Sequence, residues 1–150
     1  MPQSLSKVYV HLTFSTKLRR PLIDDAVKHD LWEYFGGVCK SLECPPLRVG
    51  GASDHIHICC LLSKKIAQMK LAEDVKRLSS KWIKTRSPEY WDFYWQKGYA
   101  IFSVNPTDVD SVIHYIDRQE EHHRQKTFKE ELLLFLKKYG AEYDERFLWE

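Results

Sequence analysis

Two histidines separated by one residue stand in the most strand-like stretch of the chain. His55 and His57 belong to the segment HIHICCLL, in which Ile56 and Ile58 alternate with them. Side chains alternate between the two faces of a strand, so both imidazoles point to one side, about 7 Å apart along the strand, and the isoleucines point into a core. Imidazole is a good ligand for divalent metal ions, with oxygen ligands supplied from elsewhere. A half-exposed strand with two incidental histidines is the alternative.

A tyrosine and a glutamine one helical turn apart form the second candidate. Tyr115 lies on the flank of the apolar stripe of a predicted helix, and Gln119 follows four residues later on the same side. A phenol in this position is partly buried, with a neutral amide oxygen beside it that can ligate a metal. A boundary tyrosine that covers the core, with glutamine as its solvated neighbour, is the alternative. The stripe itself consists of Val109, Val112, Ile113 and Ile116.

Cations and aromatic rings follow one another in the middle of the chain. A predicted helix carries Lys76, Arg77 and Lys81, and the segment SPEYWDFYWQKG behind it includes Trp91 and Trp95. Cationic side chains beside exposed rings can follow a phosphate backbone and stack unpaired bases. A solvated helix face next to core aromatics is the alternative.

Other reactive side chains have weaker patterns. We expect four glutamates to lie on a helix surface rather than to form an acid/base pair: Glu120, Glu121, Glu130 and Glu131. His122 and His123 together with Cys59 or Cys60 are a further hypothesis for a metal cluster, although the cysteines lack the spacing of structural zinc sites. The chain has no Gly-rich phosphate loop and no G-x-S-x-G motif.

The elements that must position these residues follow from hydrophobic periodicity. Strands are predicted over residues 7–15, 47–52, 55–62 and 99–104. Helices are predicted from Asp24 or Asp25 to the Pro45-Pro46 pair, and over 66–85, 108–125 and 128–139. For the last helix, Thr127 and Glu130 form a capping box and Gly140 stands at the C-cap. The order β-α-β-β-α-β-α-α predicts one α+β domain with helices packed on an antiparallel sheet.

The composition agrees with one ordinary globular domain. The 150 residues are 43% hydrophobic and 29% charged, and the net charge of +2 is too small to indicate nucleic-acid binding by itself. No apolar run is long enough to span a membrane, and the N-terminus lacks the pattern of a secretory signal. We therefore expect a soluble cytosolic protein whose four cysteines are reduced and mostly buried.

In combination, these motifs resemble those of the single-tyrosine HUH transposases, found in small insertion sequences of the 200/605 group and as repeat-associated transposases. DHIHICCLL resembles their His-hydrophobic-His motif, and the text from HYIDRQ to the C-terminus resembles their C-terminal half. SLSKVYVHLTFSTKLRRPLI and VKRLSSKWIKT are also typical of them, so the resemblance covers nearly the whole chain. It implies one HUH endonuclease domain of ferredoxin-like arrangement over residues 1–150, of which roughly residues 140–150 are a C-terminal tail.

The resemblance also implies a role for each motif residue. His55, His57 and Gln119 would be ligands of Mg²⁺ or Mn²⁺, and Tyr115 the nucleophile that attacks single-stranded DNA. Its product would be a 5′-phosphotyrosine link and a free 3′-OH that a second transesterification can rejoin. A neutral His-His-Gln ligand set would leave the full charge of the cation available to the scissile phosphate.

The implied partners are single-stranded DNA hairpins at element ends and a second copy of the chain in a homodimer, with no membrane and no nucleotide cofactor. The setting is the cytoplasm of a bacterial or archaeal cell. We predict DNA contacts for five side chains: Lys76, Arg77, Lys81, Trp91 and Trp95. A non-catalytic or domesticated hairpin-binding protein on the same fold is one alternative, and a zinc-stabilised structural protein is another.

Overall fold

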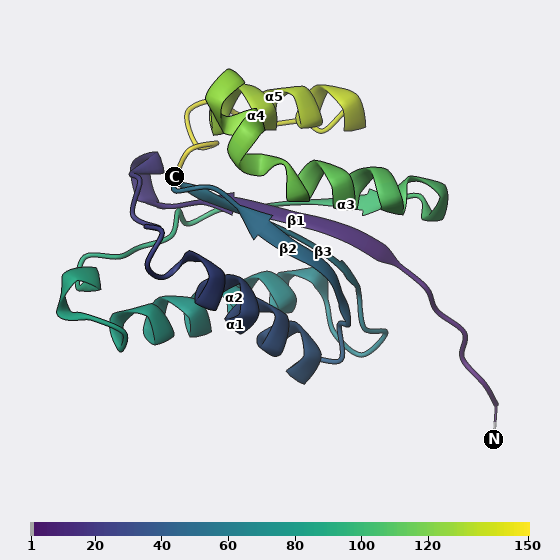
Figure 1. Cartoon of the computed structure of the whole chain (residues 1–150). Coiled ribbons are helices and arrows are strands. Elements are labelled where there is room, and N and C mark those ends of the chain that lie inside the picture. Colours follow the sequence, from purple (N-terminus) through teal and green to yellow (C-terminus); the bar gives the residue numbers. More distant parts are fainter. Residues whose placement is uncertain (1) are drawn as a thin grey trace.

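A four-stranded antiparallel sheet organises the chain, whose computed structural model describes residues 2–150 except for the side chains of His122 and His123. The order across the sheet is β2-β3-β1-β4, and each neighbouring pair is antiparallel. The α+β class predicted from the sequence is therefore confirmed (Figure 1). The strands are β1 (Tyr9–Ser15), β2 (Pro46–Gly51), β3 (His55–Leu61) and β4 (Ala100–Val104).

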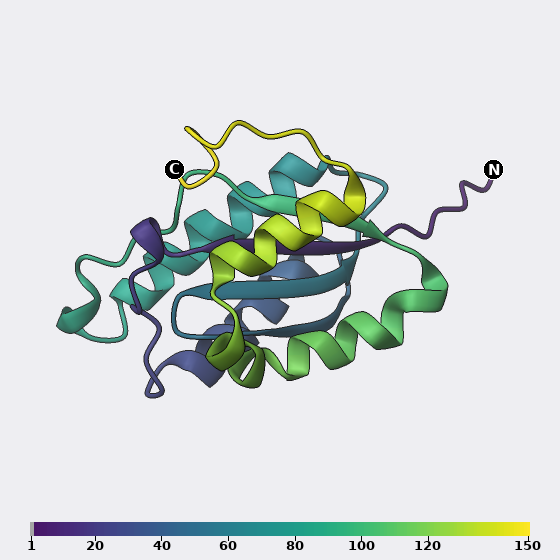
Figure 2. The same cartoon turned by 90° about the horizontal axis from the view of Figure 1, so that it is seen from above.

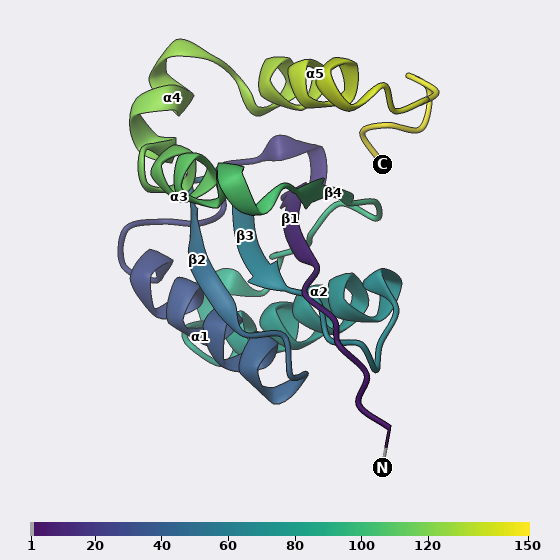
Figure 3. The same cartoon turned by 90° about the vertical axis from the view of Figure 1, so that its right-hand side faces the viewer.

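Helices cover both faces of this sheet. One face carries α1 (Lys28–Ser41) and α2 (Gln68–Lys84), and the other carries α3 (Val109–Asp117), α4 (Gln119–Gln125) and α5 (Phe128–Tyr139) (Figure 3). Seen from above, α5 crosses the strands, whereas α3 runs along the β2 side of the sheet (Figure 2). Short 3-10 helices are η1 (Lys17–Arg19), η2 (Pro88–Tyr90) and η3 (Pro106–Asp108).

The two faces of the middle strands differ in chemistry. On β1 and β3 the apolar side chains, among them Leu12 and Ile58, are buried in the main core together with residues of α1 and α2. The alternate residues, among them His11, Thr13, His55 and His57, are also buried but lie toward α3, α4 and α5. A second, smaller core joins Phe102 of β4 to Phe128, Leu132 and Leu136 of α5. Polar groups on β1 and β3 are thus held in a layer between the sheet and three helices.

The last helix matches its prediction from capping residues. α5 spans Phe128–Tyr139, the Thr127 hydroxyl accepts a hydrogen bond from the backbone N–H of Glu130, and Gly140 is left-handed with φ 62°. Beyond it the chain turns back onto the body, where Leu148 and Trp149 pack against the smaller core. The backbone N–H of Lys97, just before β4, donates to the carbonyl of Glu150.

The prediction of a single helix over residues 108–125 was wrong. The structure has η3, α3 and α4 instead, and Arg118, at φ −101° and ψ 19°, separates α3 from α4. The reason is a tertiary contact: the kink turns Gln119 toward the sheet, where its side chain is buried against His55. Within the described residues, none of the helices combines the length and the apolarity that crossing a bilayer requires.

Candidate active site

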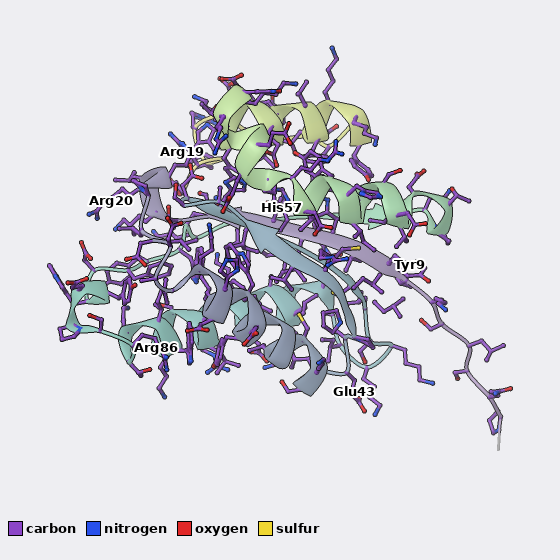
Figure 4. All side chains as sticks on the ribbon, viewed as in Figure 1. Tyr9, Arg19, Arg20, Glu43, His57 and Arg86 are labelled. Carbon is purple, nitrogen blue, oxygen red and sulfur yellow. The ribbon has the colours of Figure 1, made fainter. Side chains whose placement is uncertain are left out.

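Strand β3 places both histidines of the His-x-His motif in the layer between the sheet and helices α3 to α5. His55 and His57 are fully buried, and their rings lie edge to face with centroids 5.1 Å apart. Figure 4 shows His57 beneath the upper helices, whereas Arg86, at the end of α2, lies on the far side of the sheet. Both imidazoles therefore point to one side of the strand, as the alternation of residues predicts.

Two short contacts, one at each ring nitrogen, hold His55 in place. Nδ1 of His55 lies 2.7 Å from Asp54 Oδ1, so this nitrogen carries the proton and donates. Nε2 lies 2.7 Å from Oε1 of Gln119, whose amide group is oriented by donating to the Tyr115 carbonyl at 3.2 Å. A ring nitrogen and an amide oxygen approach this closely only when a proton or a cation lies between them. Burial alone would lower the pKa of His55, but Asp54 and Glu131 outweigh it and raise the pKa.

A second close contact joins His57 to α5. Nε2 of His57 lies 2.7 Å from Oε1 of Glu131, yet neither buried atom has a partner in hydrogen-bonding geometry among the described residues. The other ring nitrogen, Nδ1, lies 2.7 Å from Nε2 of His11. Burial lowers the pKa of His57, which is thus neutral near pH 7. Burial would raise the pKa of Glu131, but the contact with His57 outweighs it and lowers the pKa to about 2.

The donor atoms fit a divalent cation. One ligand atom each from His55, His57 and Glu131 all lie within 4.8 Å of one another, and Gln119 Oε1 adjoins His55. Neutral imidazole, amide oxygen and carboxylate are ligands that ions such as Mn²⁺ and Mg²⁺ accept. A ligating histidine usually donates its second N–H to a neighbouring acceptor, as Asp54 and His11 allow here. The convergence of these buried ligand atoms on one small space is the observation that points to a cation.

Glu131 corrects two expectations from the sequence. We expected it on a helix surface, but it is only 5% exposed because α5 packs this side of its axis against the sheet. It also makes the prospective ligand set anionic rather than neutral. The signal was available in the sequence, since residue 131 falls three positions after Phe128 and next to Leu132, inside the apolar stripe of α5.

Helix α3 brings Tyr115 to the same group. Its ring meets the His57 ring edge to face at 5.6 Å and the Phe135 ring at 5.5 Å. Burial, the negative charge of Glu131 and a hydrogen bond to that carboxylate all raise the pKa of the phenol. Tyr115 is therefore a protonated phenol at neutral pH, and it needs a proton acceptor to act as a nucleophile.

A cavity opens beside this tyrosine. It has a volume of about 690 Å³ and lies between α3 and α5. His11, Tyr115 and Glu131 belong to its lining, together with apolar residues such as Leu134 and Phe135. The site is thus not sealed: Tyr115 can be approached from the gap between the two helices.

The five predicted DNA contacts do not lie around this site. Lys76, Arg77 and Lys81 belong to α2, on the opposite face of the sheet from His55 and His57 (Figure 1). Arg77 and Lys81 are exposed. The ammonium group of Lys76 donates to the carbonyls of Lys97 and Gly98, at 2.8 and 2.9 Å.

The two predicted tryptophans differ from each other. Trp91 is 75% exposed, so its ring is open to solvent. Trp95 is only 8% exposed, packs against Phe14 and Phe93, and donates its indole N–H to Ser79. The ring of Trp95 is thus part of the main core, so the structure does not favour the DNA contact predicted for it.

The zinc-cluster hypothesis finds no support in the described side chains. His122 and His123 lie outside them. Cys59 and Cys60 are buried free thiols, and the group of prospective ligands found among the described residues contains no cysteine. The expectation that most cysteines are buried is confirmed, since all four are.

Comparison with known proteins gives a family and a fold. A family model described as "Transposase IS200 like" matches residues 4–119. The crystal structure of a protein from Deinococcus radiodurans R1, named a transposase by inference, superposes with a TM-score of 0.62 at 16% identity, covering 79% of this chain and 98% of that one. A REP-associated tyrosine transposase bound to a REP hairpin gives 0.58 at 13% identity, covering 82% and 73%. At these identities the two structures show a shared fold. Among curated proteins, none matches this chain.

Proposed function

Because the chain belongs to the family of IS200-like transposases, we propose that it cuts and rejoins single-stranded DNA through a covalent link to Tyr115. The observation that carries this proposal is the convergence of a phenol and four metal-ligand side chains from β3, α4 and α5 within one chain. Transposition requires a strand to be broken and rejoined, and a covalent protein–DNA link keeps the bond energy for the second step. No nucleotide cofactor is then needed.

Four side chains would hold the divalent cation, Mg²⁺ or Mn²⁺: His55, His57, Gln119 and Glu131. When bound, such an ion polarises the scissile phosphate and offsets the negative charge that develops on it. The residues around the ligands fix their orientation. Asp54 holds the ring of His55 through Nδ1, and His11 adjoins Nδ1 of His57, so both Nε2 atoms face the same space.

The covalent step uses Tyr115 and Glu131. The phenolic oxygen attacks the phosphorus, the bond from phosphorus to the 3′-oxygen breaks, and the strand remains attached as a 5′-phosphotyrosine. Glu131, which accepts a hydrogen bond from the phenol, takes its proton. The departing 3′-oxygen takes a proton from solvent. In the reverse sense, a free 3′-OH attacks the phosphotyrosine and the phenol is released.

The substrate and the assembly are the finer parts of the proposal. The neighbour solved with a REP hairpin supports a DNA hairpin as the ligand of this chain too. Arg77, Lys81 and Trp91 are kept as contacts to the hairpin, on the face of the sheet away from the cleavage site, because all three are exposed. A homodimer, located in the cytoplasm, remains a prediction from the family resemblance, and sedimentation equilibrium tests it.

The decisive experiment is a Tyr115→Phe variant with hairpin oligonucleotides drawn from the DNA that flanks the gene. With Mg²⁺ or Mn²⁺ the wild type should form an adduct that survives a denaturing gel, and EDTA should abolish it. Tyr115→Phe should bind the hairpins within about twofold of the wild type but form no adduct, because the nucleophile is lost. Tyr143→Phe, in the exposed tail, is the matched control and should form the adduct normally.

Two results would contradict the proposal. An adduct in the Tyr115→Phe variant would assign the nucleophile to another residue. Tight hairpin binding by the wild type without an adduct under any metal condition would favour a non-catalytic hairpin-binding protein instead.

A further inference from the structure

The cavity beside Tyr115 has the composition of a binding site for one unpaired nucleotide. We call it the α3–α5 cleft and define it by Tyr115, Glu131 and His11 on its floor, Phe135 on its wall, and Lys126 and Lys138 at its rim. Its floor is buried or half-buried, whereas both lysines are exposed. The cleft thus combines an apolar, aromatic interior with cations at the entrance.

The substrate has to reach Tyr115 through an opening of this kind. His55 and His57 are fully buried, and the ring of Phe128 stacks on His55 with centroids 4.8 Å apart, which closes that side. Tyr115 itself is partly exposed and lines the α3–α5 cleft. A phosphate at its hydroxyl therefore has its neighbouring nucleotide in or at this cleft.

The volume of the cleft indicates the size of the molecule that it can bind. A volume of about 690 Å³ falls in the range of sites that enclose one small molecule. A paired base must first be unpaired and unstacked before it can enter such a site, whereas an unpaired base enters without that cost. Bases stack on aromatic side chains, and lysines contact the phosphate backbone. Phe135 and the Lys126–Lys138 pair supply both elements.

Polar groups on the α3 side complete the site. Asp108 and Ser111 line the cleft opposite the lysines, and both are exposed. A carboxylate and a hydroxyl can accept hydrogen bonds from the edge of a base, and a hydroxyl can also donate one. The cations, Lys126 before α5 and Lys138 on it, and the acceptors, Asp108 of η3 and Ser111 of α3, would thus place the phosphate and the base on different sides of the cleft.

We propose that the α3–α5 cleft binds the unpaired nucleotide next to the phosphate that Tyr115 attacks, with its base against Phe135 and its backbone at Lys126 and Lys138. The proposal rests on the proposed function, since it assumes that Tyr115 is the nucleophile. It adds a source of strand selectivity: the enzyme reaches a phosphate only where the adjoining base is free to enter the cleft.

A pair of neighbouring lysines tests the proposal. Lys138 lines the cleft, whereas Lys137 faces a different groove. Lys138→Glu and Lys137→Glu change the same charge in the last turn of α5, so their effects on the helix and on long-range electrostatics are matched. In EDTA and low salt, Lys138→Glu should weaken the binding of a hairpin with single-stranded flanks by about tenfold, and Lys137→Glu by less than about twofold. Equal weakening by both would overturn the proposal.

Photocrosslinking tests the position of the unpaired base on the wild-type protein. An oligonucleotide with 5-iodouracil at successive flanking positions is irradiated in complex with the wild-type protein, and the linked peptide is sequenced. One position should link to the peptide that contains Phe135. Links confined to the segment around Trp91 would overturn the cleft as a base site. The adduct assay on the wild type is independent, so an adduct with no Phe135 link rejects only the cleft, and a link without an adduct rejects only the enzymatic function.

Discussion

A single carboxylate sets the charge of the site. Glu131 is ionised because its contact with His57 lowers its pKa to about 2, and it touches both a prospective ligand and Tyr115, the proposed nucleophile. The anionic ligand set binds a divalent cation more tightly than two imidazoles and an amide would, but it leaves less positive charge for the phosphate. At the proposed site, Glu131 would therefore weaken the electrostatic activation of the phosphate. It would also strengthen the binding of the cation and place a proton acceptor next to the phenol.

Glu131→Gln should weaken the binding of Mn²⁺ by about 10- to 100-fold, because the amide keeps an oxygen donor but loses the charge. Calorimetric titration with Mn²⁺ measures the affinity. Glu130→Gln removes the same charge one position away, from an exposed side chain, and should leave the affinity within about twofold. Equal affinities of Glu131→Gln and the wild type would exclude Glu131 as a ligand.

The affinity for metal should fall as the pH is lowered through the neutral range. The pKa of His55 is raised above its usual 6.5 by Asp54 and Glu131 against the effect of burial. Protonated His55 thus stabilises the metal-free fold, fully below its unfolded pKa and less as the pH rises through its folded pKa. The cation must displace this proton, so binding strengthens over the same interval. Titrations with Mn²⁺ between about pH 5.5 and 8.5 measure it, and a flat profile would mean that His55 is no ligand.

Residue types and spacing predicted which side chains lie near one another along short stretches of the chain. Strand alternation put His55 and His57 on one face, and helical spacing put Gln119 near Tyr115, although α3 ends between these two residues. The sequence did not assign Glu131 and His11 to the site. Glu131 comes from α5, far along the chain, and His11 comes from β1, the strand next to β3. Sequence periodicity describes one element at a time, so it does not report which side chains meet across elements.

At the scale of elements, the position of α3 depends on a close contact with β2. A Cβ atom at Gly50 would lie 2.8 Å from Cγ2 and 3.0 Å from the carbonyl oxygen of Ile116. Ile116 is buried and directly follows Tyr115. The absence of a side chain at Gly50 therefore lets α3 dock at the distance that places Tyr115 against His57.

Gly50→Ala should displace α3 and slow adduct formation at least tenfold, since the nucleophile moves away from the ligand set. The overpacking should also lower the free energy of unfolding by about 1–3 kcal/mol. Urea denaturation and the adduct assay measure the two effects. Gly37→Ala, in α1 with nothing within 4 Å of the added atom, should instead raise the stability by about 0.5–1 kcal/mol. An active, stable Gly50→Ala variant would refute this account of α3.

The helix boundaries differ in how far the sequence predicts them. The bounds of α5 could be predicted because its capping residues act locally, through Thr127 and Gly140. The kink at Arg118 could not, because the residue types around it continue a helical pattern. It depends on the contact of Gln119 with His55, which lies 64 positions earlier.

At the scale of the whole molecule, the last residues join distant parts of the chain. The indole of Trp149 lies between the guanidinium group of Arg19, at 5.1 Å, and the ammonium group of Lys129, at 5.2 Å. Arg19 belongs to η1 after β1, and Lys129 lies in the first turn of α5. The tail therefore ties the helix that carries Glu131 to the end of β1.

Trp149→Ala should lower the free energy of unfolding by about 1–2 kcal/mol, because a half-buried aromatic ring and two cation–π contacts are lost. Chemical denaturation measures the change. Phe147→Ala removes a ring that is 59% exposed from the same tail and should cost less than about 0.5 kcal/mol. Equal losses in both variants would show that the contacts of Trp149 do not hold the tail.

The arrangement of the layers could be predicted only in part. The fold class followed from the order of the elements, but the placement of α2 on the face away from His57 did not follow from its charges. An amphipathic helix can pack its apolar stripe against either face of a sheet and expose its cationic face to solvent. The residue pattern of α2 therefore does not indicate which face of the sheet this helix covers.

The alternation of residues along β3 links the proposed metal site to the register of the sheet. Because His55 and His57 interleave with Ile56 and Ile58, a slip of one residue in the pairing with β1 would turn both histidines into the apolar core and both isoleucines toward the acids. Such a misthreaded chain would lose its metal ligands and its main core together. Uptake of a metal ion at the proposed site would therefore also report the correct pairing of β3 with β1.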